Sequence, residues 1–215
     1  MKSTYFSEQD RLFYKDGYLL GKQVKNKNLL SGAIESMYEA IDQLIESLLK
    51  MAARNGIRVD CRKGCSRCCQ QPVFANSYEL QFLGEFVKKK FSPEEQAAIL
   101  RRAKEKNYRT SQLSGKAILN NKMPCPLLKD SACSVYPVRP LACRIYLSTR
   151  LSSCIQFYNQ PEAPDSIPEL LGFPLRAGRM MNQGFFDALK ENSLFSSELR
   201  IEEGIAGYLE SGDLL

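Results

Sequence analysis

The stretch CRKGCSRCC, residues 61–69, places four cysteines within nine positions of a 215-residue chain that contains no histidine. Cysteine that only fills a core behaves as a small buried hydrophobe, and packing does not require thiols so close together. The other four cysteines follow at residues 125, 133, 143 and 154, and the segments 1–60 and 155–215 contain none. This confinement indicates that the eight thiols share one chemical task.

The composition is that of a soluble globular protein, with 44% hydrophobic and 25% charged residues. Such a chain can bury a core without cross-links, so the cysteines are not needed to hold a mini-protein together. Residues 1–20 are interrupted by charges and lack the apolar segment of a signal peptide. No later stretch approaches the roughly 18 apolar residues of a membrane span. We therefore expect a cytoplasmic protein without membrane contact, in a reducing compartment where disulfides seldom persist.

Closely spaced cysteines in a reducing compartment point to a metal. Thiolates are soft ligands that suit zinc, iron–sulfur clusters or copper(I). The spacing Cys61-x3-Cys65-x2-Cys68 lets a tight turn wrap round one centre, and Gly64 and Ser66 favour that turn. A four-cysteine zinc site normally uses two short-spaced pairs, but this chain has that spacing only between Cys65 and Cys68. Iron–sulfur clusters accept dispersed ligands more readily, so the spacing favours a cluster over zinc.

The adjacent cysteines Cys68 and Cys69 fit poorly on one tetrahedral ion, because neighbouring side chains tend to diverge. One of them is expected to bind a second metal, or to lie beside the first metal without binding it. We rank the ligands accordingly. Cys65, Cys68, Cys133 and Cys143 come first, followed by Cys61, Cys69, Cys125 and Cys154.

Basic residues accompany both groups of cysteines: Arg62, Lys63 and Arg67 lie inside the first, and Arg139 and Arg144 lie beside the second. Several thiolates on one centre carry net negative charge, which nearby cations offset while lowering thiol pKa values. The same residues are equally well explained as the surface of a chain with a formal charge of +6.

The clearest helix is predicted over LLSGAIESMYEAIDQLIESLLKMAARNG, residues 29–56, where apolar residues recur at three-and-four spacing. Asn55 and Gly56 supply a left-handed stop, and the apolar stripe is expected in the core. A second helix is predicted to begin at the capping box formed by Asn76 and Glu79.

A third helix is predicted from the capping box at residues 92–95 to about Arg109. Between Lys88 and Arg109 there are eight Lys or Arg and three Glu, whereas residues 187–213 carry seven acids against two basic residues. We expect two solvated helix faces of opposite sign, with the pair Glu202-Glu203 in solvent. Alternatively, the Lys88–Arg109 face contacts nucleic acid or an acidic protein, although aromatic residues are sparse within it.

Residues 121–154 change character, because four prolines there exclude long regular elements. Something other than backbone ladders must organise this segment. The C-terminal third is again predicted to be helical, and its expected core residues are Met180, Phe185, Phe186 and Leu189. A last helix is predicted over residues 197–209. We therefore predict a mainly α fold, in which residues 1–215 form a single helical domain. Its helical segments 1–60 and 155–215 flank a proline-rich, cysteine-rich metal-binding region, residues 61–154.

The two cysteine blocks together resemble the YkgJ-type cysteine-cluster family, whose members are described as zinc- or iron-chelating proteins. The family pattern is a CxxxCxxCC-like opening, a polar-x-x-Glu cap, and a block containing Cys-x-(Val/Ile)-Tyr-x-x-Arg-Pro-x-x-Cys-Arg. Here these parts are residues 61–69, residues 76–79, and CPLLKDSACSVYPVRPLACRIY over residues 125–146, with Cys154 as the final cysteine. The resemblance implies metal binding by the cysteines, and it leaves zinc and iron open.

Three further residues of the second block are assigned to the surroundings of the centre: Tyr136, Arg139 and Arg144. The Arg139-Pro140 step keeps the chain extended and then starts a short helix at Leu141 that delivers Cys143. Tyr136 either packs beside the site, with its hydroxyl reaching a partner, or is an ordinary core residue.

The function predicted is metal binding, to an iron–sulfur cluster by preference or to zinc, with a redox or a structural role. An iron–sulfur oxidoreductase falls within this reading. The Cys61-x3-Cys65-x2-Cys68 spacing is also that of radical-SAM enzymes, and a protein-methylating enzyme is a related alternative. A metal-stapled module that binds nucleic acid or protein is the third possibility. The absence of histidine excludes Ser-His and Cys-His nucleophile pairs and a histidine-bound catalytic zinc.

Overall fold

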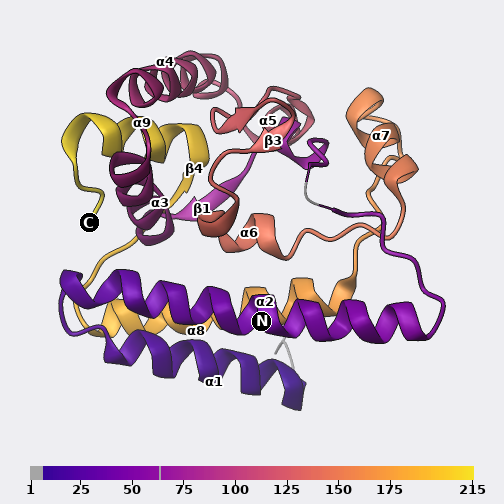
Figure 1. Ribbon diagram of the computed structural model, residues 1–215, viewed down its shortest axis with the longest axis horizontal. Coiled ribbons are helices and arrows are strands. Elements are labelled where there is room, and N and C mark those ends of the chain that lie inside the picture. Colours follow the sequence, from indigo (N-terminus) through magenta and orange to yellow (C-terminus); the bar gives the residue numbers. More distant parts are fainter. Residues whose placement is uncertain (1–6, 63) are drawn as a thin grey trace.

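The computed structural model describes residues 7–62 and 64–215, and this part of the chain is mainly helical. The mainly α fold class expected from the sequence is therefore confirmed. In Figure 1 the long helices form a lower and an upper group. The lower group consists of α1 (Glu8–Gln23), α2 (Leu30–Arg54) and α8 (Gly172–Glu191). The upper group consists of α3 (Ser77–Lys90), α4 (Pro93–Thr110) and α9 (Ile201–Ser211).

The remaining elements are short. The helices are α5 (Gly115–Asn120), α6 (Leu141–Arg144) and α7 (Leu151–Asn159), with 3-10 turns at Lys27–Leu29, Cys68–Gln70 and Tyr136–Val138. The strands are β1 (Phe74–Asn76), β2 (Leu128–Lys129), β3 (Ala132–Cys133) and β4 (Glu198–Arg200). The expectation that prolines keep the elements of residues 121–154 short is confirmed as far as Arg150, but the nine-residue α7 begins at Leu151, within that range and beyond its last proline. None of the helices in the described part of the chain combines the length and apolar character that crossing a membrane requires.

Helix α2 confirms the long amphipathic helix predicted from the sequence. Its buried face contains Leu30, Ile34, Met37, Tyr38, Ile41 and Ile45. The stripe is only half-buried toward the C-terminal end, at Leu44, Leu48 and Leu49. The helix ends at Arg54, and Gly56 follows with φ +69, the left-handed conformation that glycine adopts at little cost.

Both predicted capping boxes are present. In α3 the side chains of Asn76 and Glu79 bond reciprocally to the backbone at the start of the helix. In α4 the Ser92 hydroxyl accepts a hydrogen bond from the Glu95 amide at 3.3 Å, and Pro93 occupies the first helical position. These helices begin where the sequence placed them because a cap is satisfied within a single turn.

The last helix begins later than predicted. Residues 198–200 form strand β4, which pairs antiparallel with β1 in the register Phe74↔Arg200, and α9 starts only at Ile201. The amide of Ser77 also donates to the carbonyl of Ser197 at 2.8 Å. The segment is extended because its backbone groups find partners in a strand more than a hundred residues earlier in the chain.

The expectation of two fully solvated charged faces is wrong where α4 meets α9. Lys106 and Glu202 lie 3.5 Å apart across this contact, with side chains 4% and 0% exposed. The Thr110 hydroxyl donates to Glu202 at 3.0 Å, which supplies a further polar partner in the interior. Nearer the surface, Lys104 and Glu210 pair at 2.7 Å. The basic and acidic segments therefore neutralise one another across part of their faces.

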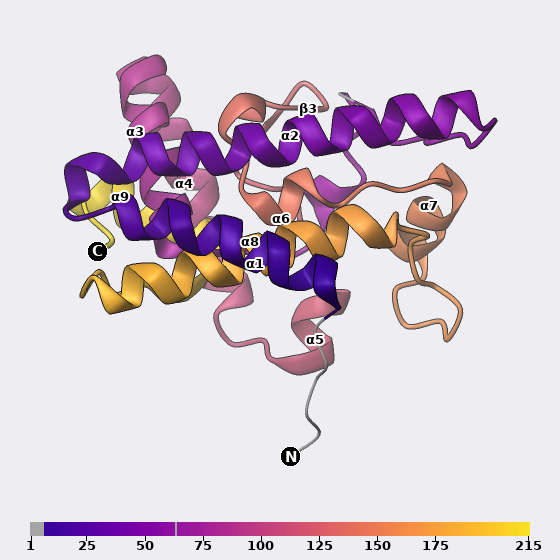
Figure 2. The ribbon, with the colours of Figure 1, turned by 90° about the horizontal axis from the view of Figure 1, so that it is seen from below.

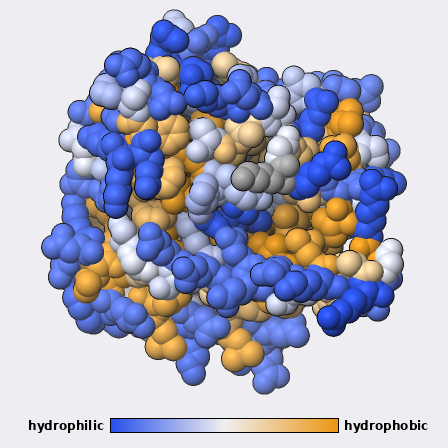
Figure 3. Space-filling view, viewed as in Figure 1, coloured by the Kyte–Doolittle hydropathy of each residue, from blue (hydrophilic) through white to orange (hydrophobic). Residues whose placement is uncertain are grey.

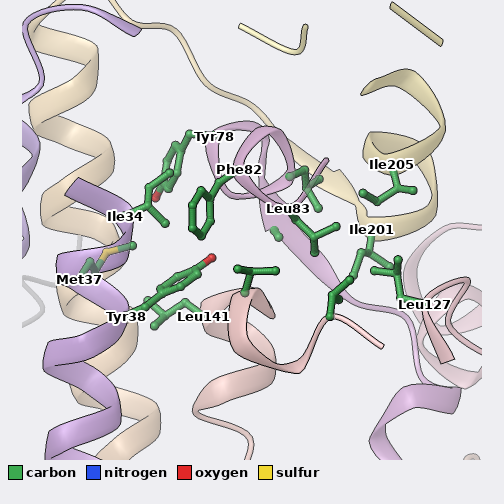
Figure 4. Close-up of a cluster of buried hydrophobic side chains, with 14 of the residues drawn as sticks. Ile34, Met37, Tyr38, Tyr78, Phe82, Leu83, Leu127, Leu141, Ile201 and Ile205 are labelled. Carbon is green, nitrogen blue, oxygen red and sulfur yellow. The ribbon is translucent and has the colours of Figure 1, made fainter. Parts of the chain in front are cut away.

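The core joins the two groups of helices and the cysteine-bearing segment. Figure 4 shows this junction, with side chains from α2, α3, α6 and α9 directed toward one another. The residues labelled there are Ile34, Met37, Tyr38, Tyr78, Phe82, Leu83, Leu127, Leu141, Ile201 and Ile205. Of the core predicted in the C-terminal third, Phe185 and Leu189 are buried, whereas Met180 and Phe186 are half-buried and Met181 takes an interior position.

Helices α1 and α8 run side by side within the lower group (Figure 2). An added Cβ on Gly17 would overlap the main-chain oxygen of Met181, and one on Gly184 would overlap the main-chain oxygen of Tyr14. Glycine at these positions lets the two backbones approach closely. Beside this contact the Tyr14 hydroxyl donates to Asp187 at 2.8 Å. The lower group is thus held by close helix packing that involves no cysteine.

This close approach predicts the effect of adding a methyl group. Gly17→Ala is expected to lower the free energy of unfolding by about 1–3 kcal/mol, because the new Cβ has no room against the α8 backbone. Gly32→Ala on α2 is the matched control, since a Cβ there meets nothing within 4 Å and alanine favours helix by up to about 1 kcal/mol. Urea denaturation of both variants measures the difference, and equal stability of the two would contradict the packing described.

Candidate metal centre

The cysteine-bearing segments enclose a cavity of about 190 Å³. Seven of the eight cysteines line it, drawn from residues 61–69 and from residues 125–143. Apolar residues such as Leu127, Val135 and Leu147 complete much of the wall. Figure 3, which has the orientation of Figure 1, shows apolar surface in orange between α2 and the upper half of the molecule. Folding therefore brings the thiols of two distant segments to one partly apolar cavity.

A second, smaller cavity of about 20 Å³ lies beside the first. Its sulfur-bearing residues are Cys61, Cys65, Cys68 and Cys154. The first three also line the larger cavity, whereas Cys154 lines the smaller cavity and not the larger one. All eight predicted ligands thus line one or both of these neighbouring cavities.

The first cysteine block is folded by local turns. The amide of Cys65 donates to the carbonyl of Arg62 at 3.1 Å, and the amide of Cys69 donates to the carbonyl of Ser66 at 3.1 Å. Gly64 has φ +91, a conformation that side chains other than that of glycine strain to adopt. The tight turn predicted at Gly64 is therefore present, and it presents successive thiols toward the cavities.

Backbone hydrogen bonds tie this block to the later cysteines. The amide of Cys125 donates to the carbonyl of Cys69 at 2.7 Å. On the other side, the amide of Cys61 donates to the carbonyl of Ser148 at 3.2 Å, and its thiol lies 3.8 Å from the carbonyl oxygen of Tyr146. The block is therefore fixed between residue 125 at one end and the approach to α7 at the other.

Helix α6 places Cys143 as the sequence predicted. The chain remains extended through Arg139 and Pro140, and α6 then runs over Leu141–Arg144. The amide of Cys143 donates to the carbonyl of Pro140 at 2.9 Å. The amide of Leu141, at the first turn, donates to the Glu79 carboxylate at 2.7 Å.

Glu79 joins three helices. Besides the Leu141 amide of α6, its carboxylate accepts hydrogen bonds from the Tyr38 hydroxyl of α2 at 2.9 Å and from the Asn76 amide before α3 at 3.4 Å. Glu79 is 1% exposed, and this burial raises the pKa of its carboxyl group while the hydrogen bonds oppose the rise. The sequence identified Glu79 only as a helix cap, because its contacts with α2 and α6 are not local.

Arg144 is directed toward α2. Its side chain is 1% exposed and ion-pairs with Asp42, while its guanidinium lies 4.0 Å from the centre of the Tyr38 ring. It also donates to the carbonyls of Arg139, at 2.9 Å, and Pro137. The sequence assigned Arg144 to offset thiolate charge, but its own charge is paired with Asp42. Its role toward a metal stays a prediction.

Arg144 lines the larger cavity, and other predicted cations also line one of the two cavities. Arg139 and Tyr136 both line the larger cavity, and the Arg139 guanidinium stacks 3.9 Å from the centre of the Tyr136 ring. Arg62 lines the larger cavity and Arg67 the smaller one. Lys63 lies outside the described residues. The placement of Tyr136 and Arg139 beside the cysteines agrees with the roles assigned to them, and those roles stay predictions.

Burial governs the thiol chemistry. It raises the pKa of Cys125 to about 11 and the pKa values of Cys61, Cys133, Cys143 and Cys154 above their usual range. A metal or cluster would reverse this effect, because a bound cation favours the thiolate.

The vicinal pair lies where the two cavities meet, since Cys68 lines both of them and Cys69 lines only the larger one. The neighbouring Cys69 thiol lowers the pKa of Cys68 to about 7, and the same proximity raises the pKa of Cys69. The expectation that the two side chains diverge stays a prediction.

A site residue that the sequence did not reveal is Asp60. Its carboxylate accepts a hydrogen bond from the Leu151 amide at 3.0 Å, at the first turn of α7, the helix that carries Cys154. Asp60 also lines the smaller cavity. An acidic residue directly before the first cysteine was the only local signal, and its partner lies ninety-one positions away.

The donor atoms are of the right type for a thiolate-bound metal, but the sulfurs are too far apart to hold a single ion as they stand. All eight cysteines are unpaired, buried or half-buried, and of the soft type that zinc and iron–sulfur clusters accept. Within residues 7–62 and 64–215, no group of three or more Cys, Asp or Glu side chains is close enough together to hold a metal ion. Binding a single ion would require the sulfurs to draw in to about 3.8 Å from one another, given Zn–S bonds of about 2.3 Å.

The comparison with protein families now adds an independent finding. Residues 60–163 match the family described as "CxxCxxCC: Putative zinc- or iron-chelating domain". The predicted resemblance to a cysteine-cluster family is confirmed over this segment, which includes all eight cysteines and α7. Comparison with curated proteins and with solved structures finds no match for the chain.

The position of Glu79 generates a prediction for this region. Glu79→Ala is expected to lower the free energy of unfolding by about 3 kcal/mol or more, because the Leu141 amide and the Tyr38 hydroxyl lose a buried acceptor at about 1–3 kcal/mol each. Glu39→Ala, at an exposed position beside Tyr38, serves as control and should change stability by less than about 0.5 kcal/mol. Urea denaturation compares the two, and a small, similar loss in both would show that Glu79 does not anchor α6.

Proposed function

We propose that this chain is an iron–sulfur protein whose cluster is bound by cysteines of the larger cavity and organises the segment around it. The observation that carries the proposal is the convergence of seven thiols, from residues 61–69 and 125–143, on one cavity of about 190 Å³. The match of residues 60–163 to a family of zinc- or iron-chelating domains supports binding of a metal by these cysteines.

Two observations favour a cluster over a single zinc ion in this cavity. The ligand spacing is dispersed, which clusters tolerate better than zinc sites do. The cavity is much larger than one ion needs. A cluster holds its ligand sulfurs farther apart than one zinc ion does, so it requires a smaller rearrangement of these thiols.

The role we propose is primarily structural. Between residues 121 and 150 the described elements are no longer than the four-residue α6, so few backbone ladders support this segment. A metal centre that links it to residues 61–69 would supply the missing constraint. The unpaired state of all eight cysteines fits a reducing compartment such as the cytoplasm. A redox role for the same cluster is the second candidate, and Arg139 beside the thiols is the feature that would tune its potential.

The alternatives considered from the sequence receive less support. Within residues 7–62 and 64–215 the strands form only antiparallel pairs, whereas a radical-SAM enzyme requires parallel strand–helix repeats. On the basic Lys88–Arg109 stretch, several charges already have partners within the chain. Lys104 pairs with Glu210, Lys106 pairs with Glu202, and Arg109 pairs with Glu105. A nucleic-acid or protein partner at this face stays a prediction.

Purification under exclusion of oxygen tests the main proposal. The protein is expected to be brown, with a broad visible absorption band, and to contain iron together with acid-labile sulfide. Cys143→Ser should abolish the band, because it removes a sulfur that lines the larger cavity. Ala117→Ser, at an exposed position of α5 that lines neither cavity, adds the same hydroxyl without removing a sulfur and should leave the spectrum unchanged. A colourless, iron-free protein that keeps its fold would refute the proposal.

The structural role predicts which parts of the chain exchange their amide hydrogens faster once the metal is removed. Chelation is expected to speed amide exchange in residues 125–146, with the Cys125 and Ser134 amides among those affected. Exchange in α1 and α8 should not change, because the close packing of Gly17 and Gly184 involves no cysteine. Hydrogen exchange followed by mass spectrometry measures both regions. Unchanged exchange in residues 125–146 after loss of the cluster would favour the redox role instead.

A further inference from the structure

The number of thiols exceeds what one centre can use. A zinc ion or an iron–sulfur cluster of the common kinds takes four cysteines, and this chain gathers eight at two adjoining cavities. The excess cannot be assigned to disulfides, since all eight are unpaired. The question is therefore whether the thiols divide into two sets, and the geometry answers it.

The first set surrounds the smaller cavity. Cys61, Cys65, Cys68 and Cys154 line it. Within this set Cys65-x2-Cys68 is the short-spaced pair typical of zinc sites.

The second set belongs to the larger cavity. Cys69, Cys125, Cys133 and Cys143 line it and are absent from the wall of the smaller cavity. The amide of Cys125 donates to the carbonyl of Cys69 at 2.7 Å, which fixes the two residues beside each other. Strand β3 and helix α6 bring Cys133 and Cys143 to the same space.

The vicinal pair is the boundary between the sets. Cys68 and Cys69 begin a 3-10 turn, in which successive side chains project about 120° apart. Cys68 lines both cavities, whereas Cys69 lines only the larger one. One side chain of the pair can therefore serve each centre, and this explains why two adjacent cysteines are present.

We propose that the chain holds two different metal centres that meet at Cys68 and Cys69. Cys61, Cys65, Cys68 and Cys154 bind a single zinc ion, and Cys69, Cys125, Cys133 and Cys143 bind the iron–sulfur cluster. Zinc binding requires the first four sulfurs to draw together, because no three donors in the described part of the chain are close enough to hold one ion as they stand. The sizes of the cavities carry the distinction, since about 20 Å³ is the space of one water-sized sphere and about 190 Å³ leaves room for several atoms. This inference rests on the proposed function for the cluster, and it adds a zinc site to it.

The zinc centre has a structural consequence for α7. In the described part of the chain, α7 does not pack extensively against another helix or strand, and it stands at one end of the molecule (Figures 1 and 2). Its links to the first cysteine block are the Asp60–Leu151 hydrogen bond at 3.0 Å and the Arg67 guanidinium 5.5 Å from the centre of the Tyr158 ring. Cys154 on zinc would add the strongest link, so the ion docks α7 onto the block.

Metal analysis of the anaerobically purified chain and of two variants tests the division. The wild-type protein is expected to contain about one zinc ion per chain in addition to iron and sulfide. Cys154→Ser should remove the zinc, keep the visible band and speed amide exchange in α7. Cys143→Ser should remove the band and keep the zinc. Ser152→Ala, an exposed position on α7, and Ala117→Ser on α5 are the matched controls and should keep both metals.

Each other outcome has a definite meaning. Iron without zinc in the wild-type chain, or loss of the visible band in Cys154→Ser, would overturn the two-centre inference while leaving the iron–sulfur proposal intact. Zinc without iron would refute the cluster, and a metal-free protein would refute both proposals. Because a variant could fail to fold, X-ray absorption at the zinc edge of the wild-type chain gives a direct check. It should report four sulfur neighbours at about 2.3 Å, and nitrogen or oxygen neighbours would contradict the ligand set.

Discussion

The buried carboxylate of Glu79 is the contact on which the position of the cysteine segment depends. It accepts hydrogen bonds from the Tyr38 hydroxyl of α2, from the backbone that begins α3, and from the Leu141 amide of α6. A carboxylate in the interior must have such partners, because an unpaired buried charge is very costly. The Leu141 amide in turn needs an acceptor, because the first amides of α6 have no partner within the helix. The helix that carries Cys143 is thereby fixed to the helical frame by one side chain.

Arg144 completes this anchorage from the other end of α6. Its guanidinium lies against the Tyr38 ring, pairs with Asp42 and donates to the carbonyls of Arg139 and Pro137. The cation thus satisfies backbone groups in a segment whose prolines leave few ladder partners. Glu79 and Arg144 together orient α6 so that its buried polar contacts face α2 and α3. Cys143 is left facing the cavity, where the other thiols gather.

The molecule therefore separates two tasks. Helices α1, α2 and α8 are held by apolar packing and by the glycine contact, neither of which requires a ligand. The segment from residue 121 to α7 has only short elements and is held largely by hydrogen bonds of backbone turns. It also contributes to the two cavities lined by cysteines. A metal centre would contribute most in this second part, where intrinsic packing contributes least. Burial raises the pKa values of the thiols there, and a bound cation would favour their thiolate form.

Features that depend on a few consecutive residues could be predicted from the sequence. The capping boxes at Asn76 and Ser92, the stop at Gly56, the short elements near the prolines and the start of α6 are all of this kind, and so is the grouping of the cysteines by number and spacing. Tertiary structure alone decided the burial of Glu202 against Lys106, the extension of residues 198–200 against β1, and the second bond partners of Glu79. It also decided which thiols line which cavity. These features need partners tens to more than a hundred positions away, and a local pattern carries no information about which distant group will satisfy a buried charge, a strand edge or a thiol.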